Sequence, residues 1–221
     1  MNADKTPSTG IDRRSLAQKV ADALREEILS GGYVAGDPVH QDKVAKKMHT
    51  SRVPVREALK QLESEGLVEN LPYKGALVTG LTKNELGEYC EIRASLESQL
   101  LEKALPNMTK ACCEEADGEI LKFGQANAKD WSELNWRLHS VLYRPANRPV
   151  TVKEVAGMYR KMERYIRLHL SLSKFIRDRA NDEHRELVSL CRAKNKKAVQ
   201  FLHDHIIEAR DELVEFLDHH D

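Results

Sequence analysis

Three histidines and one asparagine in the second half of the chain have positions that suit a metal site. Asn135 and His139 are four residues apart, so on a helix they share one face, as two ligands of one ion must. His184 and His205 each belong to a later helical segment. Three neutral imidazoles with one oxygen ligand suit zinc, nickel or a similar divalent ion, and such a site can leave a coordination position open for a carboxylate.

Two alternatives accompany this prediction. Any single histidine, taken alone, is more often a half-buried side chain that binds no ion, and the chain has nine of them. On the last helical segment, His203 competes with His205 as a ligand. We choose His205 because it lies nearer the centre of the predicted core stripe, which consists of Val199, Leu202, Ile206, Ala209 and Leu213.

Arginines offer a second kind of chemistry, the recognition of anions. Arg160, Arg164 and Arg167 recur on one face of a predicted helix, and arginine can pair with a carboxylate through two parallel hydrogen bonds. We predict that Arg93 and Arg164 bind the carboxylate of a small ligand. For any one arginine the alternative is a solvated basic face that pairs with neighbouring acids such as Glu163.

A cluster of positive charge lies in residues 43–60, although the whole chain balances 35 Lys and Arg against 35 Asp and Glu. Local basicity in a neutral protein is typical of a surface that neutralises phosphates. Arg52, Arg56 and Lys60 are spaced by four on a helix predicted over 51–65. Beside them runs a predicted buried stripe of Val55, Ala58, Leu59 and Leu62.

A helix of this kind can enter the major groove of DNA, where arginine binds guanine O6 and N7 or contacts phosphates. For this helix alone, an ordinary amphipathic helix with a solvated basic face is the alternative. The neighbouring segments favour the DNA-binding interpretation. The predicted elements, in order, are a helix over 15–30, a turn at 36–38, a short helix over 41–47, the helix over 51–65 and two strands over 68–71 and 76–79.

This order of elements is that of a winged helix-turn-helix. Ser51 is the predicted N-cap of the second helix of the motif, and Pro54 lies in its first turn, where a missing N–H costs little. Lys74 and Gly75 form the predicted hairpin tip. They are expected to contact phosphates or the minor groove, because glycine lets the backbone approach closely.

From Thr82 onward the pattern is helical. Thr82 and Glu85 have the spacing of a capping box, and breaks are predicted near Pro106, 126–130, 144–149, 171–173 and 194–196. The predicted fold is mainly α. It consists of a disordered tail over 1–11, an α+β winged helix-turn-helix domain over 12–80 and an all-helical bundle over 81–221.

Composition excludes several classes of protein. The cysteines at 90, 112, 113 and 191 lack zinc-finger or C-x-x-C spacing, and Cys112 and Cys113 are predicted to be a buried pair rather than a redox switch. No stretch has the length and apolarity of a signal peptide or a membrane span. We therefore expect a cytoplasmic protein with free thiols.

The first part of the chain resembles the GntR family of bacterial transcriptional regulators. The resemblance spans residues 15–80 and is carried by SRVPVREAL at 51–59 and LESEGLV at 62–68. It implies that Ser51, Arg52, Pro54 and Arg56 contact DNA together with the tip of the wing. Asp42 stands where members often have a basic residue, so no DNA contact is predicted there.

Residues 83–217 resemble the all-helical FCD effector domain of the FadR-type branch of that family. The similar segments are residues 91–97, the N-x-x-x-H element at 135–139, residues 183–187 and His205-Ile206. The resemblance implies an effector-binding and dimerisation domain with a metal site. Asn135 replaces the usual Asp, and a neutral amide is a weaker metal ligand than a carboxylate.

Together these observations predict a DNA-binding transcriptional regulator that acts as a homodimer on a palindromic operator. The resemblance implies a repressor, and it implies that the effector is a small organic acid bound in the helical domain on a divalent metal ion. One alternative is a metal-dependent hydrolase, but the sequence has no H-E-x-x-H motif, no convincing general base and no phosphate-binding glycine loop. The other is a dimeric DNA-binding or structural protein that senses nothing.

Overall fold

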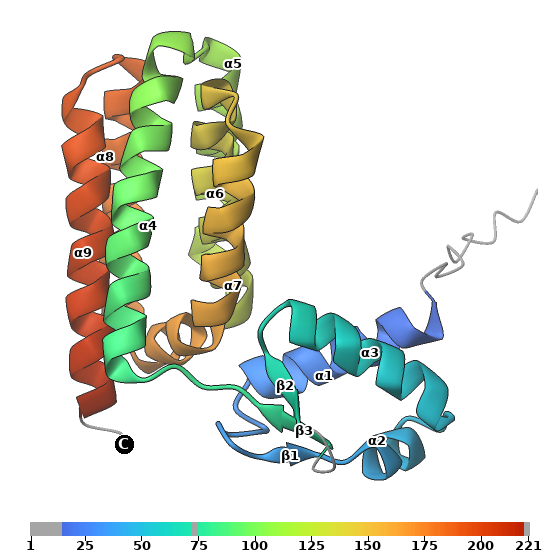
Figure 1. Ribbon diagram of the computed structural model, residues 1–221. Helices are drawn as coiled ribbons and strands as arrows, with labels where there is room; N and C mark the ends of the chain where they lie inside the picture. Colours follow the sequence, from blue (N-terminus) through green and yellow to red (C-terminus); the bar gives the residue numbers. More distant parts are fainter. Residues whose placement is uncertain (1–14, 72–74, 219–221) are drawn as a thin grey trace, which may run out of the picture.

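The computed structural model describes residues 15–71 and 75–218, and it consists of a small head beside an elongated helical body (Figure 1). The predicted tail over 1–11 and Lys74 lie outside the described residues. No described helix combines the length and the apolarity that crossing a membrane requires.

The head contains three helices and a three-stranded antiparallel sheet. Its elements are α1 (Leu16–Leu29), β1 (Pro38–Val39), α2 (Gln41–Lys47), α3 (Arg52–Ser64), β2 (Val68–Leu71) and β3 (Gly75–Val78). The sheet order is β1-β3-β2, with Val68 opposite Val78 and Val39 opposite Ala76. This arrangement confirms the predicted winged helix-turn-helix, with helix ends within one residue of the predicted ones.

Local sequence explains where α1 begins and ends. The side chain of Ser15 accepts a hydrogen bond from the Gln18 N–H at 3.1 Å and caps the helix. Gly31 follows the helix with a φ of +85°, a conformation that costs glycine little. Between these ends, Val20, Leu24 and Ile28 point into the core of the head.

One strand was not predicted. Residues 36–38 are interpreted from sequence as a turn, yet Pro38 and Val39 pair with β3 as a short edge strand. Proline is tolerated there because an edge position does not need its N–H. Only the pairing with a segment almost forty residues later makes these two residues a strand.

The body is all-helical, as predicted. Its α-helices are α4 (Lys83–Ala104), α5 (Lys110–Ile120), α6 (Ala128–Tyr143), α7 (Pro149–Leu172), α8 (Lys174–Arg192) and α9 (Lys197–Asp218). Short 3-10 turns follow α4, α5 and α6 at Leu105–Asn107, Phe123–Gln125 and Arg144–Ala146. The predicted capping box is present at the start of α4, where Thr82 and Glu85 exchange both hydrogen bonds.

Packing in the body follows the predicted stripes. α4 lies along α9 (Figure 1), and α5 packs against both α6 and α8. Leu202, Ile206 and Leu213 of the predicted α9 stripe are buried. Cys112 and Cys113 are free, buried thiols, as expected.

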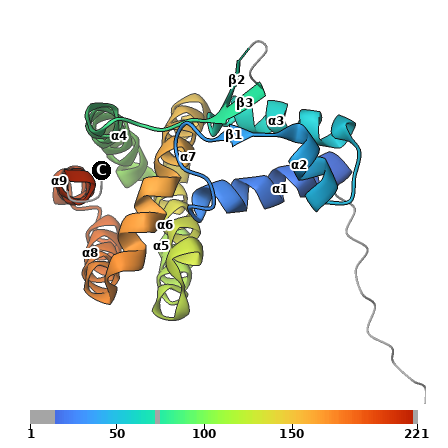
Figure 2. The same cartoon turned by 90° about the horizontal axis from the view of Figure 1, so that it is seen from below.

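The head contacts the body where the C-terminal end of α1 meets α7 (Figure 2). The segment between β3 and α4 is held against α7 as well. The Tyr165 hydroxyl accepts a hydrogen bond from the Leu81 N–H at 2.5 Å and donates one to the Leu81 carbonyl at 3.1 Å. α7 therefore contacts both the head and the segment that leads from it into the body.

Candidate metal centre and nucleic-acid interface

Packing brings three of the predicted metal ligands together in the middle of the body. His139 comes from α6, His184 from α8 and His205 from α9, and each offers a ring nitrogen within 4.8 Å of the other two. His139 and His184 are buried and His205 is nearly so. Three different helices thus present three imidazoles to one point.

Hydrogen bonds orient two of these rings. His139 Nδ1 lies 2.9 Å from the Tyr143 hydroxyl, which donates to Glu97 Oε2 at 2.5 Å. His205 Nδ1 lies 2.6 Å from Glu183 Oε2. Each partner engages Nδ1 and leaves Nε2 for a ligand, which is how hydrogen-bonded carboxylates and hydroxyls commonly fix a metal-binding histidine.

His184 has no such partner among the described residues. Both of its ring nitrogens are buried without a hydrogen bond, and Trp131 and Phe123 flank the ring with centroids 5.6 Å and 5.3 Å away. Burying an imidazole nitrogen without a partner is unfavourable. A metal ion bound by the three rings would give one of these nitrogens a partner. The donor set therefore fits a divalent cation.

Burial also favours the neutral form of His139 and His184. Desolvation holds the pKa of His139 well below its usual value, with smaller contributions from the neighbouring His205 and Arg93. Desolvation likewise holds the pKa of His184 well below its usual value, with smaller contributions from His205 and His139. Neutral imidazole is the form that binds metal ions, so both rings are ready to act as ligands near pH 7.

Asn135 lies one turn before His139, and both residues line a cavity beside the cluster. Its Nδ2 donates to the Tyr159 hydroxyl at 3.2 Å, and that hydroxyl donates to the Ser132 carbonyl at 2.8 Å. The amide oxygen is consequently the atom of Asn135 that could bind a cation. His203, the competing histidine, pairs with Asp204 on the surface and is not part of the cluster.

A cavity of about 80 Å³ opens beside the cluster. Arg93 lines it and is buried, with Nε donating to Glu97 Oε1 at 2.7 Å and the guanidinium 5.0 Å above the Tyr159 ring. Arg164 is not brought to this cavity. It lines a crevice between head and body instead, so the structure supplies no support for its predicted role in effector binding.

Arg179 of α8 lies in the wall of this cavity and was not predicted. It pairs with Glu183 at 3.3 Å and also with Glu212 of α9. The sequence held a signal for it, since Arg179 and Glu183 have i, i+4 spacing directly before His184. Only the packing of α8 against α9 shows that this pair faces the cavity.

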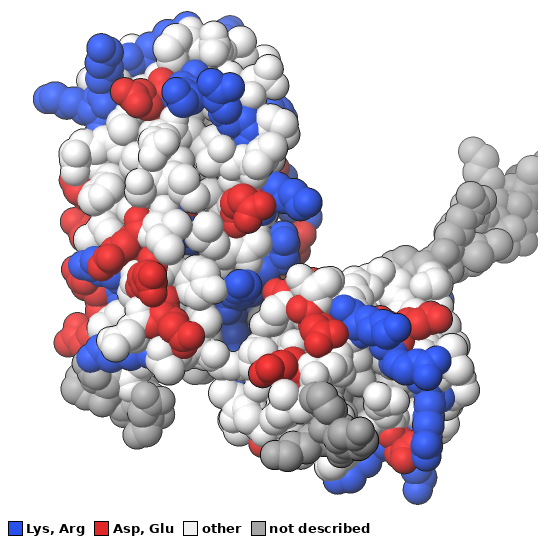
Figure 3. Space-filling view, in the orientation of Figure 1, with Lys and Arg blue, Asp and Glu red and all other residues white. Residues whose placement is uncertain are grey.

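The predicted DNA-contact residues lie on the outside of the head. In α3, Val55, Ala58, Leu59 and Leu62 are buried, whereas Ser51, Arg52, Arg56 and Lys60 are exposed and Pro54 is half-buried. Lys and Arg side chains run along this edge of the head (Figure 3). The helix therefore anchors one side in the core and presents its basic side to solvent.

Three details refine this surface. Ser51 occupies the N-cap position but makes no capping hydrogen bond, so its exposed hydroxyl is not engaged in the helix. Val53 was not predicted to contact DNA, yet it is 53% exposed beside Arg52 and is of a type that contacts the thymine methyl. Gly75, at the end of the wing, has a φ of +81° and open space around it.

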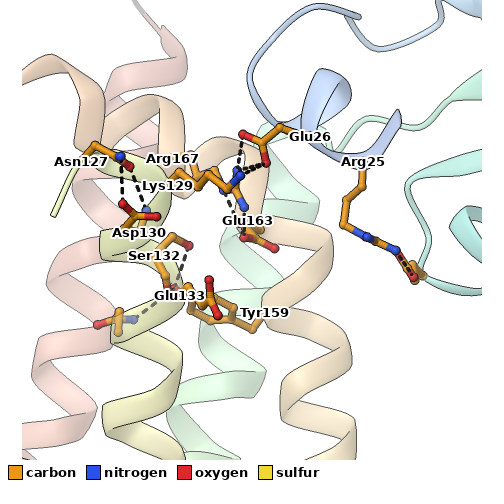
Figure 4. A network of polar contacts seen from close by, with 12 residues as sticks. Arg25, Glu26, Asn127, Lys129, Asp130, Ser132, Glu133, Tyr159, Glu163 and Arg167 are labelled. Atoms are coloured by element: carbon orange, nitrogen blue, oxygen red, sulfur yellow. Dashed lines mark hydrogen bonds and ion pairs between the residues drawn. The ribbon is translucent and has the colours of Figure 1, made fainter. Parts of the chain in front are cut away.

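An ion-pair network joins the head to the body (Figure 4). Glu26 of α1 accepts hydrogen bonds from Arg167 of α7 at 3.2 and 3.4 Å and pairs with Lys129 of α6 at 2.8 Å. Arg167 also donates to Glu163 at 2.7 Å. The other face of α7 contributes Tyr159 and His169 to the cavity. One helix thus contacts the head on one side and the cavity on the other.

Comparison with known proteins gives matches to both parts of the chain. The family model for bacterial regulatory proteins of the gntR family matches residues 16–78, and the FCD domain model matches residues 88–209. A gluconate operon transcriptional repressor from Bacillus licheniformis is 38% identical over 97 residues, which is 44% of this chain. The match spans only 40% of that repressor's length.

Two further proteins are similar over nearly the whole chain. An uncharacterized HTH-type transcriptional regulator, BphR, from Paraburkholderia xenovorans is 24% identical over 92% of this chain and 87% of its own. The solved structure of E. coli McbR/YncC superimposes with a TM-score of 0.73 at 20% identity, covering 92% of this chain and 99% of that one. At that identity the likeness shows a shared fold.

Proposed function

This chain belongs to the GntR family of bacterial regulatory proteins and carries an FCD domain, and we propose on that premise that it is a transcriptional regulator controlled by a small molecule. Residues 12–80 form the DNA-binding domain, and residues 81–221 form the effector-binding and dimerisation domain. A homodimer places two heads on a palindromic operator, because two-fold protein symmetry matches two-fold DNA symmetry. Repression is the proposed sense of regulation, since several relatives are named repressors.

The observation that carries the DNA-binding part is the exposed basic face of α3. Arg52 and Arg56 are proposed to read base edges or hold phosphates, Lys60 to contact a phosphate, and Ser51 and Pro54 to approach the backbone. Gly75 extends the surface from the wing, and Lys74 stays a DNA contact predicted from sequence. Such contacts orient a helix in the major groove, and the arginines add base recognition.

The test is the binding of DNA sequences selected by the protein from a random pool. Arg56→Ala should weaken binding to the selected sequence by about 10- to 100-fold, since a bidentate base contact contributes that much discrimination. Lys153→Ala removes an exposed positive charge from α7 of the body and serves as the matched control. Equal affinity of Arg56→Ala and wild type would contradict the assignment of α3 as the recognition helix.

The proposed effector site is the histidine cluster with its cavity. FCD domains of this family often bind metal ions, and His139, His184 and His205 would hold a divalent ion such as zinc or nickel, with Asn135 as an oxygen ligand. The ion would supply an electrophilic position for the carboxylate of an organic acid. Arg93 and Arg179 would orient the ligand from the cavity wall.

The fit of the metal is tested by elemental analysis of protein purified without chelators. Wild type should hold about one divalent ion per chain, as expected for three imidazoles at one point. His139→Ala should lose it, and His203→Ala, which changes a histidine outside the cluster, should keep it. A metal-free wild type that also fails to bind added zinc or nickel would contradict the metal site and leave the DNA-binding proposal intact.

Regulation is proposed to pass through α7. Its cavity face meets the ligand, and its opposite face holds the head through Arg167 and Tyr165. Ligand binding that shifts α7 changes the position or mobility of the head and so the affinity for the operator. Couplings of this kind typically amount to about 1–3 kcal/mol.

A further inference from the structure

An ion pair joins the two helices of the helix-turn-helix at their exposed side. Asp42 lies in the first turn of α2, and Arg52 is the first residue of α3. The Arg52 Nη2 donates to Asp42 Oδ2 at 2.8 Å, and Nε pairs with Oδ1. Both side chains are largely exposed, at 72% for Arg52 and 65% for Asp42.

The geometry of this pair leaves one fork of the guanidinium unused by Asp42. Arginine has five N–H donors, and Asp42 pairs with the two on the side of the guanidinium, at Nε and Nη2. The end pair, with one N–H on each Nη, remains directed away from the Arg52 backbone. Two parallel N–H groups of this kind match guanine O6 and N7 in the major groove.

Stability does not account for the contact. Ion pairs between exposed side chains contribute little to folding, because water screens them and two side chains must be held in one geometry. What the pair does is restrict the rotamers of a long, otherwise flexible arginine. A recognition group that is ordered before binding loses less conformational entropy when it binds.

Asp42 also changes which DNA groups Arg52 can approach. A carboxylate next to the guanidinium repels a phosphate, since like charges at close range are unfavourable. A base edge carries no such charge. Asp42 therefore weakens phosphate contacts of Arg52 and favours contact with guanine, which is specificity through the exclusion of an alternative.

We propose that Asp42 is a specificity-determining residue that positions Arg52 for guanine and keeps it off the phosphate backbone. The inference rests on the proposed function of α3. It assigns a role to a position of the helix-turn-helix for which the sequence predicts no contact with DNA. Asp42 acts through Arg52 and is a positioning residue.

The experiment compares sequences selected from a random DNA pool by wild type, Arg52→Ala, Asp42→Asn and Glu27→Gln. The substitution Asp42→Asn keeps the size of the side chain, but it removes the charge and leaves one acceptor oxygen where the arginine fork uses two. Glu27→Gln is the matched control, because it also removes one acid from an exposed ion pair of the head, that with Lys47 at 2.6 Å. Binding to selected and to non-specific DNA is then measured for each variant.

Wild type should prefer guanine at one position of each half-site, and Arg52→Ala should lose that preference. Asp42→Asn should reduce discrimination at the same position by about 10-fold while non-specific affinity rises by about 2- to 5-fold. Glu27→Gln should keep the guanine preference. Full discrimination in Asp42→Asn overturns the inference but not the proposed function, whereas a wild type that selects no sequence overturns both.

Discussion

At the scale of single residues, the Glu97 carboxylate links the core of the body to the histidine cluster. It is fully buried, and it accepts hydrogen bonds from Arg93 and from the Tyr143 hydroxyl. Tyr143 in turn reaches His139. A buried carboxylate that lacked such donors would destabilise the core, so one chain of hydrogen bonds supports both the core and the orientation of a metal ligand.

Tyr143→Phe tests this chain, because it leaves Glu97 Oε2 without its donor and His139 without its partner. We expect the free energy of unfolding to fall by about 1–3 kcal/mol and zinc affinity to fall by about 10- to 100-fold. Urea unfolding and competition with a chelating dye measure the two effects. Tyr165→Phe also loses two hydrogen bonds but lies away from the cluster, so it should keep its zinc affinity. Unchanged zinc affinity in Tyr143→Phe would show that Tyr143 does not orient His139.

At the scale of elements, α3 belongs to a core that the body does not share. Leu62 is fully buried among residues of the head, and α3 packs mainly against α1. The two tryptophans, Trp131 and Trp136, both lie on α6 of the body. Their fluorescence therefore reports on the body alone, whereas circular dichroism reports on all helices.

Leu62→Ala should destabilise the head by about 2–5 kcal/mol, the usual effect of truncating a fully buried leucine. The loss should appear as an earlier phase in the circular dichroism of urea unfolding, with an unchanged midpoint for tryptophan fluorescence. Val53→Ala truncates an exposed side chain of the same helix and should change neither signal by more than about 0.5 kcal/mol. A parallel shift of both signals in Leu62→Ala would mean that head and body unfold as one unit.

At the scale of the whole molecule, the position of the head depends on polar contacts. Glu26, Arg167 and Lys129 form the ion-pair network, and Tyr165 holds the segment before α4. Arg167 is only 11% exposed, so its pair with Glu26 is partly shielded from water. Such contacts can change partners at modest cost, which suits an interface that must respond to a ligand.

Glu26→Gln removes the negative charge with which both Arg167 and Lys129 pair. Stability should fall by less than about 1 kcal/mol, while the distance distribution between spin labels on α1 and α9 should broaden. Glu65→Gln breaks the ion pair with Arg25, which lies within the head, and should leave that distribution unchanged. An unaltered distribution in Glu26→Gln would show that this network does not hold the head in place.

Acid should weaken the same contact. Partial burial raises the pKa of Glu26, but the hydrogen bonds from Lys129 and Arg167 outweigh it and hold the pKa below its usual value of 4.5. A carboxylate with a lowered pKa stabilises the folded arrangement above its unfolded pKa and loses that effect as pH falls through the folded value. The label distances should be constant between about pH 6 and 8 and should broaden below about pH 4.5 in wild type. Glu26→Gln should lack the part of this acid dependence that comes from Glu26.

Much of the fold could be predicted from sequence because its signals are local. The 3.6-residue period of apolar side chains, the capping box at Thr82 and the glycine after α1 depend on neighbours in the chain. The helices and the wing therefore lie close to their predicted positions. β1 could not be found in this way, since two residues carry no periodicity and their strand character comes from pairing with β3.

The two candidate sites differ in the same way: one depends on local sequence and the other on tertiary packing. The basic face of α3 follows from spacing within one helix, so the sequence alone identified Arg52, Arg56 and Lys60 as one exposed set. The histidine cluster required three helices to pack in one way. That packing brought His205 rather than His203 to the other two rings, took Arg164 to the head and placed Arg179 in the cavity wall. Helical periodicity determines which residues share a face, but only tertiary packing determines what that face meets.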